Sequence, residues 1–232
     1  MKRQHRSKKY KEQALLYNLE PKSPLVEAYR NLRANLNFLS PDRELKKISF
    51  TSTDIGDGKT ITLCNLAIIM ARNEQQVLII DADLRRPKIH KYLNITNHQG
   101  LTDVLTDRVT LEEAIREGAE ECLKILPSGT LPPNPAELLA SRRMSKLLDE
   151  AGEEADIVLI DAPIVTISDA AILGNKADGV IFVVQSHDSK EEQVREAQER
   201  LERVNANILG TVLNLHPISK DGKYYNYYYP EY

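Results

Sequence analysis

The residues best suited to chemistry lie in a short segment, Gly56-Asp57-Gly58-Lys59-Thr60, between a predicted strand and a predicted helix. Glycines let the backbone turn its N–H groups toward phosphate oxygens, and the start of the following helix favours negative charge. A lysine followed by a hydroxyl residue suits binding of the β- and γ-phosphates and of Mg²⁺. The segment therefore predicts a nucleotide-phosphate site, although the common pattern has glycine where this chain has Thr53.

Carboxylates follow two further apolar runs. Asp81 and Asp83 end the run VLIIDADLRRP (77–87), and Asp161 ends DIVLIDAP (156–163). Paired carboxylates at a strand end suit Mg²⁺, which binds few protein oxygens and keeps several waters. One of them could accept a hydroxyl proton, as phosphoryl transfer requires. Arg85 and Arg86 either neutralise transferred phosphate or are ordinary solvated arginines.

Strands and helices alternate along the chain. Short apolar runs at 46–52, 76–81, 123–127, 156–161, 179–185 and 208–214 predict strands, and helical patterns such as 60–73 and 190–204 separate most of them. This order predicts an α/β fold with a mainly parallel sheet flanked by helices. Ligands then bind beyond the carboxyl ends of the strands, where the three motifs lie. No G-x-G-x-x-G follows a strand, which argues against a nicotinamide site.

Composition narrows the class of protein. The net charge of −3 does not favour nucleic acid, and no apolar stretch approaches the roughly 18 residues of a membrane span. Two cysteines, Cys64 and Cys122, provide no disulfide framework, so a reducing cytoplasm is expected. We expect a basic flexible arm over 1–22, which a membrane surface could also attract, and one domain over 23–218 that begins with a helix over 23–39.

The remaining segment, 219–232, is rich in tyrosine. Six of the ten tyrosines of the chain lie there: Tyr224, Tyr225, Tyr227, Tyr228, Tyr229 and Tyr232. The segment lacks aliphatic partners, so it should be exposed and mobile. An aromatic docking tail is one interpretation. A cluster of phosphorylation sites is the better one, because a phosphate-transfer site lies in the same chain.

Together these motifs give a family resemblance over nearly the whole chain. The segments SPLVEAYRNLR, SFTSTDIGDGKT, VLIIDADLRRP, LPSGTLPPNPAELLAS and DIVLIDAP, with the tyrosine cluster, resemble the bacterial tyrosine kinases of capsule and exopolysaccharide operons. Their fold is a P-loop ATPase of the partition and cell-division-site type.

The resemblance implies ATP and Mg²⁺ as ligands and assigns roles to residues. Lys59, Asp81, Asp83 and Asp161 would be catalytic, with Asp81 activating or orienting the acceptor tyrosine. Thr60, Asp83 and Asp161 would hold Mg²⁺, Asp161 through its water shell. The residues assigned to ATP are Gly56, Asp57, Gly58, Lys59, Thr60, Ile61 and, near adenine, Asn214.

Assembly and partners also follow from the resemblance. Glu27, Arg30 and Arg33 match an E-x-x-R-x-x-R helix that joins subunits into a ring such as an octamer. The implied partners are a transmembrane adaptor of the polysaccharide co-polymerase type, a cognate tyrosine phosphatase and protein substrates. The kinase would be cytoplasmic, recruited to the inner face of the membrane.

Two positions depart from the family pattern, which has proline where this chain has Ile55 and Ile164. One alternative function is a switch ATPase of the partition or cell-division-site type. Those ATPases carry a lysine where this chain has Asp54, and they have no reason to end in tyrosines. The other alternative is a nucleotide-binding scaffold without kinase activity, against which the intact motifs argue.

Overall fold

The computed structural model describes residues 15–19, 22–39, 45–186, 189 and 191–215. The strands are β1 (Lys47–Ser52), β2 (Val77–Asp81), β3 (Arg116–Glu117), β4 (Leu123–Leu126), β5 (Ile157–Asp161), β6 (Gly179–Gln185) and β7 (Ile208–Asn214). The helices are the 3₁₀ turn η1 (Leu16–Asn18), α2 (Pro24–Phe38), α3 (Lys59–Ala71), α4 (Ile89–Tyr92), α5 (Leu101–Leu105), α6 (Leu111–Ala114), α7 (Pro135–Ala140), α8 (Arg142–Glu154), α9 (Ser168–Lys176) and α10 (Glu191–Glu202).

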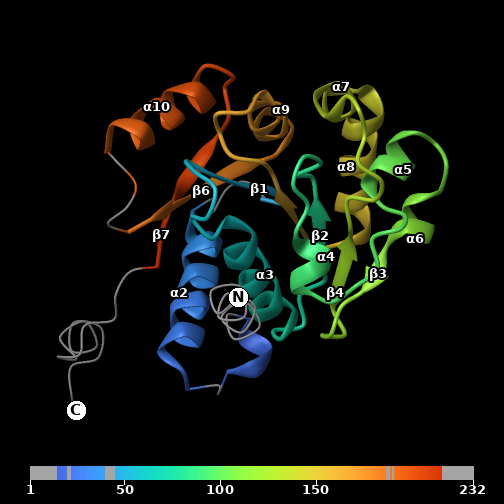
Figure 1. The fold of residues 1–232 in the computed structure, drawn as a ribbon. Coiled ribbons are helices and arrows are strands. Elements are labelled where there is room, and N and C mark those ends of the chain that lie inside the picture. Colours follow the sequence, from blue (N-terminus) through green and yellow to red (C-terminus); the bar gives the residue numbers. More distant parts are fainter. Residues whose placement is uncertain (1–14, 20–21, 40–44, 187–188, 190, 216–232) are drawn as a thin grey trace, which may run out of the picture.

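One sheet forms the centre of the molecule (Figure 1), and its strand order is β3-β4-β2-β5-β1-β6-β7. All neighbouring strands pair in parallel except β3 with β4. The predicted α/β fold with a mainly parallel sheet is thus confirmed. All six predicted strands are present. Only the two-residue β3 was not foreseen, because so short a segment has no periodicity to detect.

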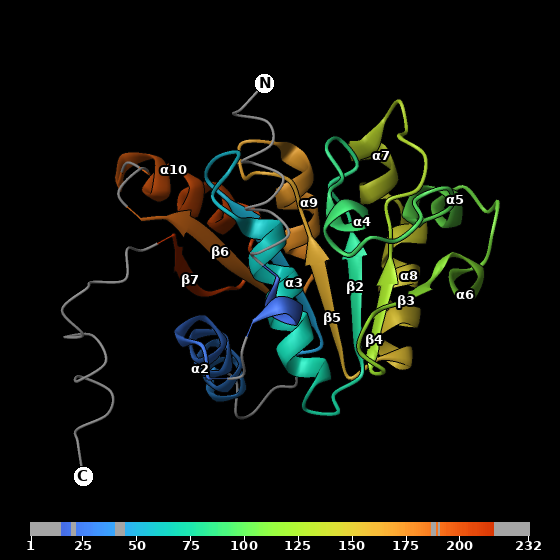
Figure 2. The ribbon, with the colours of Figure 1, turned by 60° about the horizontal axis from the view of Figure 1, so that its bottom comes forward.

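Helices cover both faces of the sheet (Figure 2). In β2, Val77 and Ile79 pack into one core cluster together with α3, while Leu78 and Ile80 pack into a second cluster with α8. This alternation follows from the period of two in a strand. Both faces are buried, which explains why the strands read as continuous apolar runs.

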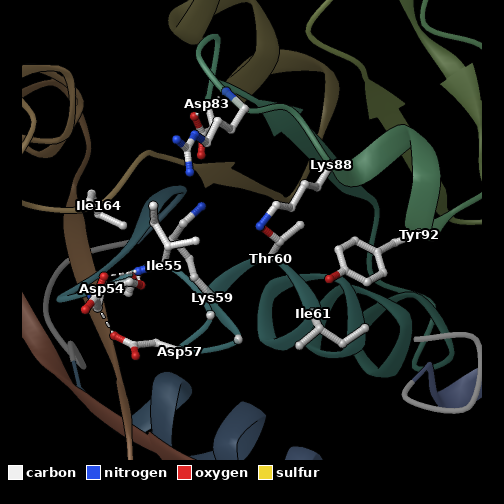
Figure 3. A pocket seen from close by; sticks show the side chains of 14 residues that line it. Asp54, Ile55, Asp57, Lys59, Thr60, Ile61, Asp83, Lys88, Tyr92 and Ile164 are labelled. Atoms are coloured by element: carbon white, nitrogen blue, oxygen red, sulfur yellow. Dashed lines mark hydrogen bonds between the residues drawn. The ribbon is translucent and has the colours of Figure 1, made fainter. Parts of the chain in front are cut away.

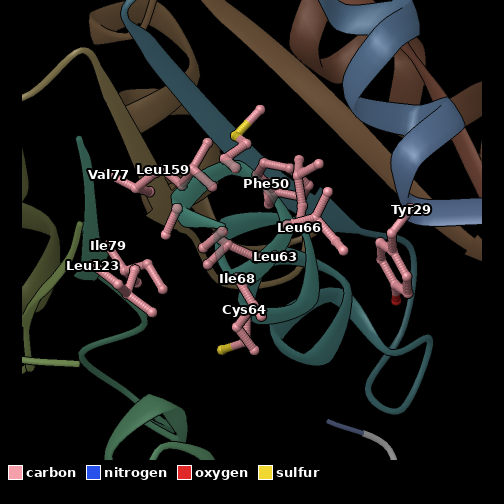
Figure 4. Packing of buried hydrophobic residues seen from close by; sticks show 14 of the residues in the cluster. Tyr29, Phe50, Leu63, Cys64, Leu66, Ile68, Val77, Ile79, Leu123 and Leu159 are labelled. Carbon is pink, nitrogen blue, oxygen red and sulfur yellow. The ribbon is translucent and has the colours of Figure 1, made fainter. Parts of the chain in front are cut away.

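The helix α3 is the centre of the first cluster (Figure 4). Its apolar residues Leu63, Leu66 and Ile68 are fully buried, and Phe50 of β1 packs beside them. Because α3 is buried nearly all round, its first turn is held rigidly above the end of β1.

The predicted flexible arm over 1–22 is wrong in its last part. Leu15 and Leu16 are buried, and the Leu16 backbone N–H donates to Asn65 Oδ1 on α3 at 3.0 Å. The two apolar side chains follow a strongly polar stretch, and their burial outweighs the cost of ordering a few residues. Residues 1–14 lie outside the described residues.

The helix α2 begins as the sequence predicts. Ser23 accepts a hydrogen bond from the Leu25 N–H, and Pro24 occupies the first helical position. Val26, Tyr29 and Leu36 form the buried stripe of α2, which packs on α3. None of the described helices combines the length and the apolarity that crossing a bilayer requires.

Candidate active site

The phosphate loop, residues 53–58, joins β1 to α3 and turns at two glycines. Gly56 and Gly58 have φ angles of 109° and 86°, a region that favours glycine. A Cβ atom on Gly58 would also lie 1.9 Å from Asn214 Nδ2. That amide donates a hydrogen bond to the Asp57 carbonyl oxygen at 2.8 Å. The end of β7 therefore braces the phosphate loop, and a contact of Asn214 with adenine stays a prediction.

The two acidic residues of the loop have different surroundings. The buried Asp57 carboxylate accepts hydrogen bonds from the Thr53 hydroxyl at 2.6 Å and from the Asp54 N–H at 2.8 Å. Asp54 is exposed, and its Oδ1 accepts from the Ile55 N–H. Thr53, where the common pattern has glycine, thus helps to close the loop. Asp57 acts as an internal brace of the loop through Oδ2.

Lys59 and Thr60 both contact the same carboxylate at the start of α3. Lys59 Nζ forms an ion pair with Asp161 Oδ1, and Thr60 Oγ1 donates to Asp161 Oδ2 at 2.8 Å. Asp161 is fully buried, and both of its partners are more than nine-tenths buried. Burial raises the pKa of Asp161, and the adjacent Lys59 charge opposes that rise. A P-loop offers its lysine to phosphate and its hydroxyl residue to metal. In this structure Asp161 occupies both groups, Lys59 and Thr60.

Asp81 lies beside Asp161, because the two residues are register partners across β2 and β5. Asp81 Oδ2 accepts from the Lys88 and Ile89 N–H groups at 3.2 and 3.1 Å. Its Oδ1 is buried and has no hydrogen-bond partner among the described residues. Burial first, and then the Asp161 charge, raise the pKa of Asp81 well above its usual range.

The loop after β2 carries the other charged groups of the site. Asp83 Oδ1 accepts from the Arg86 N–H at 3.0 Å, which closes a tight turn. Arg85 points away and makes two hydrogen bonds to the buried Asp169 at the start of α9, at 2.8 and 3.2 Å. Of the two arginines considered from the sequence, Arg86 lines the pocket and Arg85 anchors the loop.

These segments enclose a pocket of about 90 Å³ at the carboxyl end of the sheet (Figure 3). Sites that enclose a whole ligand usually measure roughly 300–1,000 Å³, so the pocket suits the phosphate end of a nucleotide. Its lining residues are Ser52, Asp54, Ile55, Gly56, Asp57, Gly58, Lys59, Thr60, Ile61, Asp83, Arg86, Lys88, Tyr92 and Ile164. The sequence-predicted Gly56–Ile61 segment and Asp83 are thus brought together. Asp81, Asp161 and Asn214 lie behind or beside the lining.

The donor set fits Mg²⁺. The Thr60 hydroxyl and the Asp161 carboxylate are in contact, and Asp83 lines the same pocket. All three offer oxygen, the donor that this hard cation prefers. The described residues contain no group of three or more acidic, histidine or cysteine side chains that could hold a metal by themselves. Such a site leaves most coordination positions to water and phosphate, as Mg²⁺ requires.

Three residues of the lining were not predicted from the sequence: Ser52, Lys88 and Tyr92. Lys88 and Tyr92 enter from α4 and the turn before it, across the pocket from Ile55. Burial raises the pKa of the Tyr92 hydroxyl. The helix α4 has only four residues, too few to give a periodic signal, so the sequence did not indicate which of its side chains would face the site.

The residues predicted to join subunits lie on α2, away from the pocket. Glu27 and Arg30 form an ion pair on the surface, and Arg33 is half-buried one turn further on. The predicted phosphorylation sites, Tyr224, Tyr225, Tyr227, Tyr228, Tyr229 and Tyr232, lie outside the described residues.

A parallel sheet with a glycine loop, a helix-start Lys-Thr pair and two acidic strand ends defines a P-loop ATPase fold. Residues 45–212 match the AAA domain family. The chain is 42% identical over 206 residues to the tyrosine-protein kinase YwqD of Bacillus subtilis, covering 88% of this chain and 87% of that protein. It is 33% identical to the putative tyrosine-protein kinase CapB of Staphylococcus aureus, covering 90% and 92%. The chain therefore belongs to the bacterial tyrosine-protein kinase family.

Solved structures agree with this assignment. The chimerical protein CapA2B2 superposes with a TM-score of 0.85 at 35% identity, covering 89% of this chain and 91% of that one. The kinase domain of the Escherichia coli tyrosine kinase ETK gives 0.80 at 32%, covering 86% and 80%. The septum site-determining protein MinD from Pyrococcus horikoshii, complexed with Mg-ADP, gives 0.65 at 26%, covering 75% and 72%. The fold is thus shared with the cell-division-site ATPases, as the sequence predicted.

Proposed function

We propose that this chain transfers the γ-phosphoryl group of ATP to tyrosine hydroxyls, beginning with its own C-terminal cluster, and so regulates capsule or exopolysaccharide synthesis. The observation that carries the proposal is the contact of Lys59 and Thr60 with Asp161 beside Asp83, at the start of a glycine loop. This arrangement suits phosphoryl transfer from a nucleotide. The family relationship supports tyrosine as the acceptor.

Each residue then has a role in the reaction. The backbone of Gly56–Thr60 surrounds the phosphates, and Lys59 moves from Asp161 to a phosphate oxygen. Thr60 and Asp83 would hold Mg²⁺, and Asp161 would orient its waters. When bound, the ion would supply positive charge that offsets the charge of the phosphates. Arg86 and Lys88 add positive charge at the pocket wall.

A carboxylate must accept the phenol proton as the new O–P bond forms and the bond to ADP breaks. Asp81 fits this role, because its Oδ1 accepts no hydrogen bond among the described residues and its pKa is raised, which makes it a stronger base. Asp81 does not line the pocket and its Oδ1 is buried, so a hydroxyl would reach it only after the atoms that cover this oxygen move. The ADP oxygen keeps the electron pair of the broken bond.

The assembly and the partners belong to the same proposal. We infer a ring of subunits joined through Glu27, Arg30 and Arg33, and a membrane adaptor that brings the kinase to the inner face of the membrane. A match to Escherichia coli etk at 34% identity covers 84% of this chain but 27% of that protein, so related kinase segments occur within longer chains. A cognate phosphatase would remove the phosphate groups from the tail.

Intact mass after incubation with MgATP tests the proposal. We expect successive additions of one phosphate that map to Tyr224–Tyr232 and that are absent in Lys59→Met. The same chain with all six tail tyrosines changed to phenylalanine should lose most of the phosphate. ATP hydrolysis without any mass gain would contradict the kinase assignment and favour a switch ATPase. A negative result has to be repeated with adaptor peptides present.

A further inference from the structure

Two isoleucines line one side of the pocket. Ile55 comes from the phosphate loop and Ile164 from the loop after β5, and both stand across the pocket from Lys88 and Tyr92 (Figure 3). The Ile55 side chain is 54% exposed, although it belongs to a loop fixed by hydrogen bonds. Ile164 is half-buried. Single exposed apolar residues are common, but an exposed and a half-buried isoleucine that line the same polar pocket are not explained by chance exposure.

Both isoleucines are held in place by their loops. The Thr51 hydroxyl donates to the Pro163 carbonyl at 2.7 Å, and the Val165 N–H donates to the Ser52 carbonyl at 2.9 Å. These bonds tie the loop that carries Ile164 to the end of β1, where the phosphate loop starts. The pair therefore forms a preorganised surface, which binds at a lower entropic cost than a flexible one.

The position of this surface indicates which end of the nucleotide it adjoins. In the sheet, β5 and β2 lie on one side of β1, and β6 and β7 lie on the other. Asn214 marks the β7 side. Ile164 follows β5, the strand of Asp161, and Asp83 and Arg86 from the loop after β2 line the same pocket. The two isoleucines thus adjoin the end where the phosphoryl group is transferred.

We propose that Ile55 and Ile164 form an acceptor lip, a pair of apolar side chains that hold the aromatic ring of the acceptor tyrosine. The proposal rests on the kinase function proposed above. A phenol has an apolar body and a polar tip, so a ring against the lip leaves its hydroxyl directed toward the charged groups of the pocket. The tail offers such rings at six positions. The lip makes the site select aromatic acceptors over serine or threonine, whose short side chains have no ring to bind.

Peptide binding to the MgADP-loaded protein tests the lip without requiring turnover. The full chain carries alanine at all six tail tyrosines, so that its own tail does not compete. A labelled peptide with one tyrosine is compared with its phenylalanine and alanine versions by fluorescence anisotropy. Ile55→Ser and Ile164→Ser are each expected to weaken binding of the tyrosine and phenylalanine peptides about tenfold, as loss of apolar contact in a pocket does. The alanine peptide should bind weakly to every form.

Leu131→Ser is the matched control, because Leu131 is about as exposed as Ile55, at 59% against 54%, but does not line the pocket. It should leave peptide affinity unchanged, and all variants should keep their MgADP affinity. Any of three results would overturn the lip: unchanged peptide affinity in the isoleucine variants, a loss of affinity for MgADP but not for the peptide, or no peptide binding by the parent protein. Mass gain of the native chain reports separately on kinase activity. Lip-dependent binding without mass gain would refute the kinase function alone, and mass gain with unaffected binding would refute the lip alone.

Discussion

At the residue scale, Lys59 is proposed to bind the phosphates, yet its ammonium is paired with the buried Asp161. Removing one member of a buried ion pair leaves an uncompensated charge and costs about 3–5 kcal/mol. The same contact keeps Thr60 engaged through a hydrogen bond. Stability and ligand binding should therefore both depend on the Asp161 carboxylate. Changes in pH and in metal concentration should affect the two properties differently.

Lys59→Met should abolish phosphotransfer and make stability depend on pH. Without the lysine charge, the pKa of Asp161 rises further above its unfolded value. A group with a raised folded-state pKa favours folding at pH values below its unfolded pKa, and this contribution is lost as the pH rises through the folded-state pKa. The variant should thus be destabilised by about 3–5 kcal/mol at pH 8 and by less at pH 5.5. Urea unfolding at both pH values measures the difference.

The double variant Lys59→Met with Asp161→Asn is the control, because a neutral amide removes the buried charge. It should recover most of the lost stability at pH 8 and show little dependence on pH. Equal destabilisation of the single variant at both pH values would mean that the ion pair is not what stabilises this part of the fold.

Asp161→Asn alone should change how metal and nucleotide depend on each other. In the native chain, ATP without Mg²⁺ has to break the Lys59 contact and leave Asp161 charged and unpaired. The variant has a free Lys59, so we expect it to bind metal-free ATP several-fold more tightly than the native chain. Calorimetric titration in EDTA measures this, and equal affinities would argue that Asp161 does not compete with ATP for Lys59. The gain from added Mg²⁺ should shrink in the variant.

At the scale of elements, the loop after β2 places Asp83, Arg86 and Lys88 around the pocket. It is held at two points: Asp81 accepts from the backbone N–H groups at the end of the loop, and Arg85, in its middle, makes a two-point contact with Asp169 on α9. Asp169 is fully buried, while Arg85 is 42% exposed. The contact therefore acts mainly by satisfying a carboxylate that water cannot reach.

Arg85→Gln should leave the Asp169 carboxylate underpaired and destabilise the protein by roughly 1–3 kcal/mol. The KM for ATP should rise more than kcat falls, because the loop that lines the pocket is loosened. Steady-state kinetics and thermal unfolding measure the two effects. Adding Asp169→Asn should restore part of the stability, and strictly additive losses would show that the two side chains do not act as a pair.

The sequence was sufficient for the strands and for the motifs that follow them. The strands β2 and β5 are buried on both faces, so their apolar runs are unbroken, and Asp81 and Asp161 end these runs. Contacts between residues far apart in the sequence could not be predicted. The Lys59–Asp161 contact joins residues 102 positions apart, and the Arg85–Asp169 contact joins residues 84 positions apart. Lys88 and Tyr92 were missed because a one-turn helix gives no periodic pattern. The bond from the Leu16 N–H to Asn65 joins residues 49 positions apart, so local sequence does not reveal it.

At the scale of the whole molecule, α2 presents charged residues on a surface distant from the pocket. Glu27 and Arg30 are paired within the chain, and the spacing of three places Arg33 on the same face. In a ring, these groups would exchange their intrachain contact for contacts with a neighbour. Such contacts involve partly exposed charges and should weaken with salt.

Changing Glu27, Arg30 and Arg33 together to alanine should yield monomers, as measured by light scattering. The fold should be retained, because the buried stripe of α2 is formed by other residues. High salt should shift the native chain in the same direction. Assembly that is unchanged in the triple variant would mean that subunits associate through another surface.

The brace between Asn214 and the phosphate loop also fixes the point from which the tail departs. Tyr224 follows Asn214 by only ten residues, a stretch that spans at most ~35 Å. If the tail tyrosines are the acceptors, as proposed above, this stretch would keep them within reach of the nucleotide pocket of their own or of an adjacent subunit. Short tethers produce effective concentrations in the millimolar range. A free substrate would then have to outcompete a permanently attached one, and exhaustive phosphorylation of the tail would remove that competition.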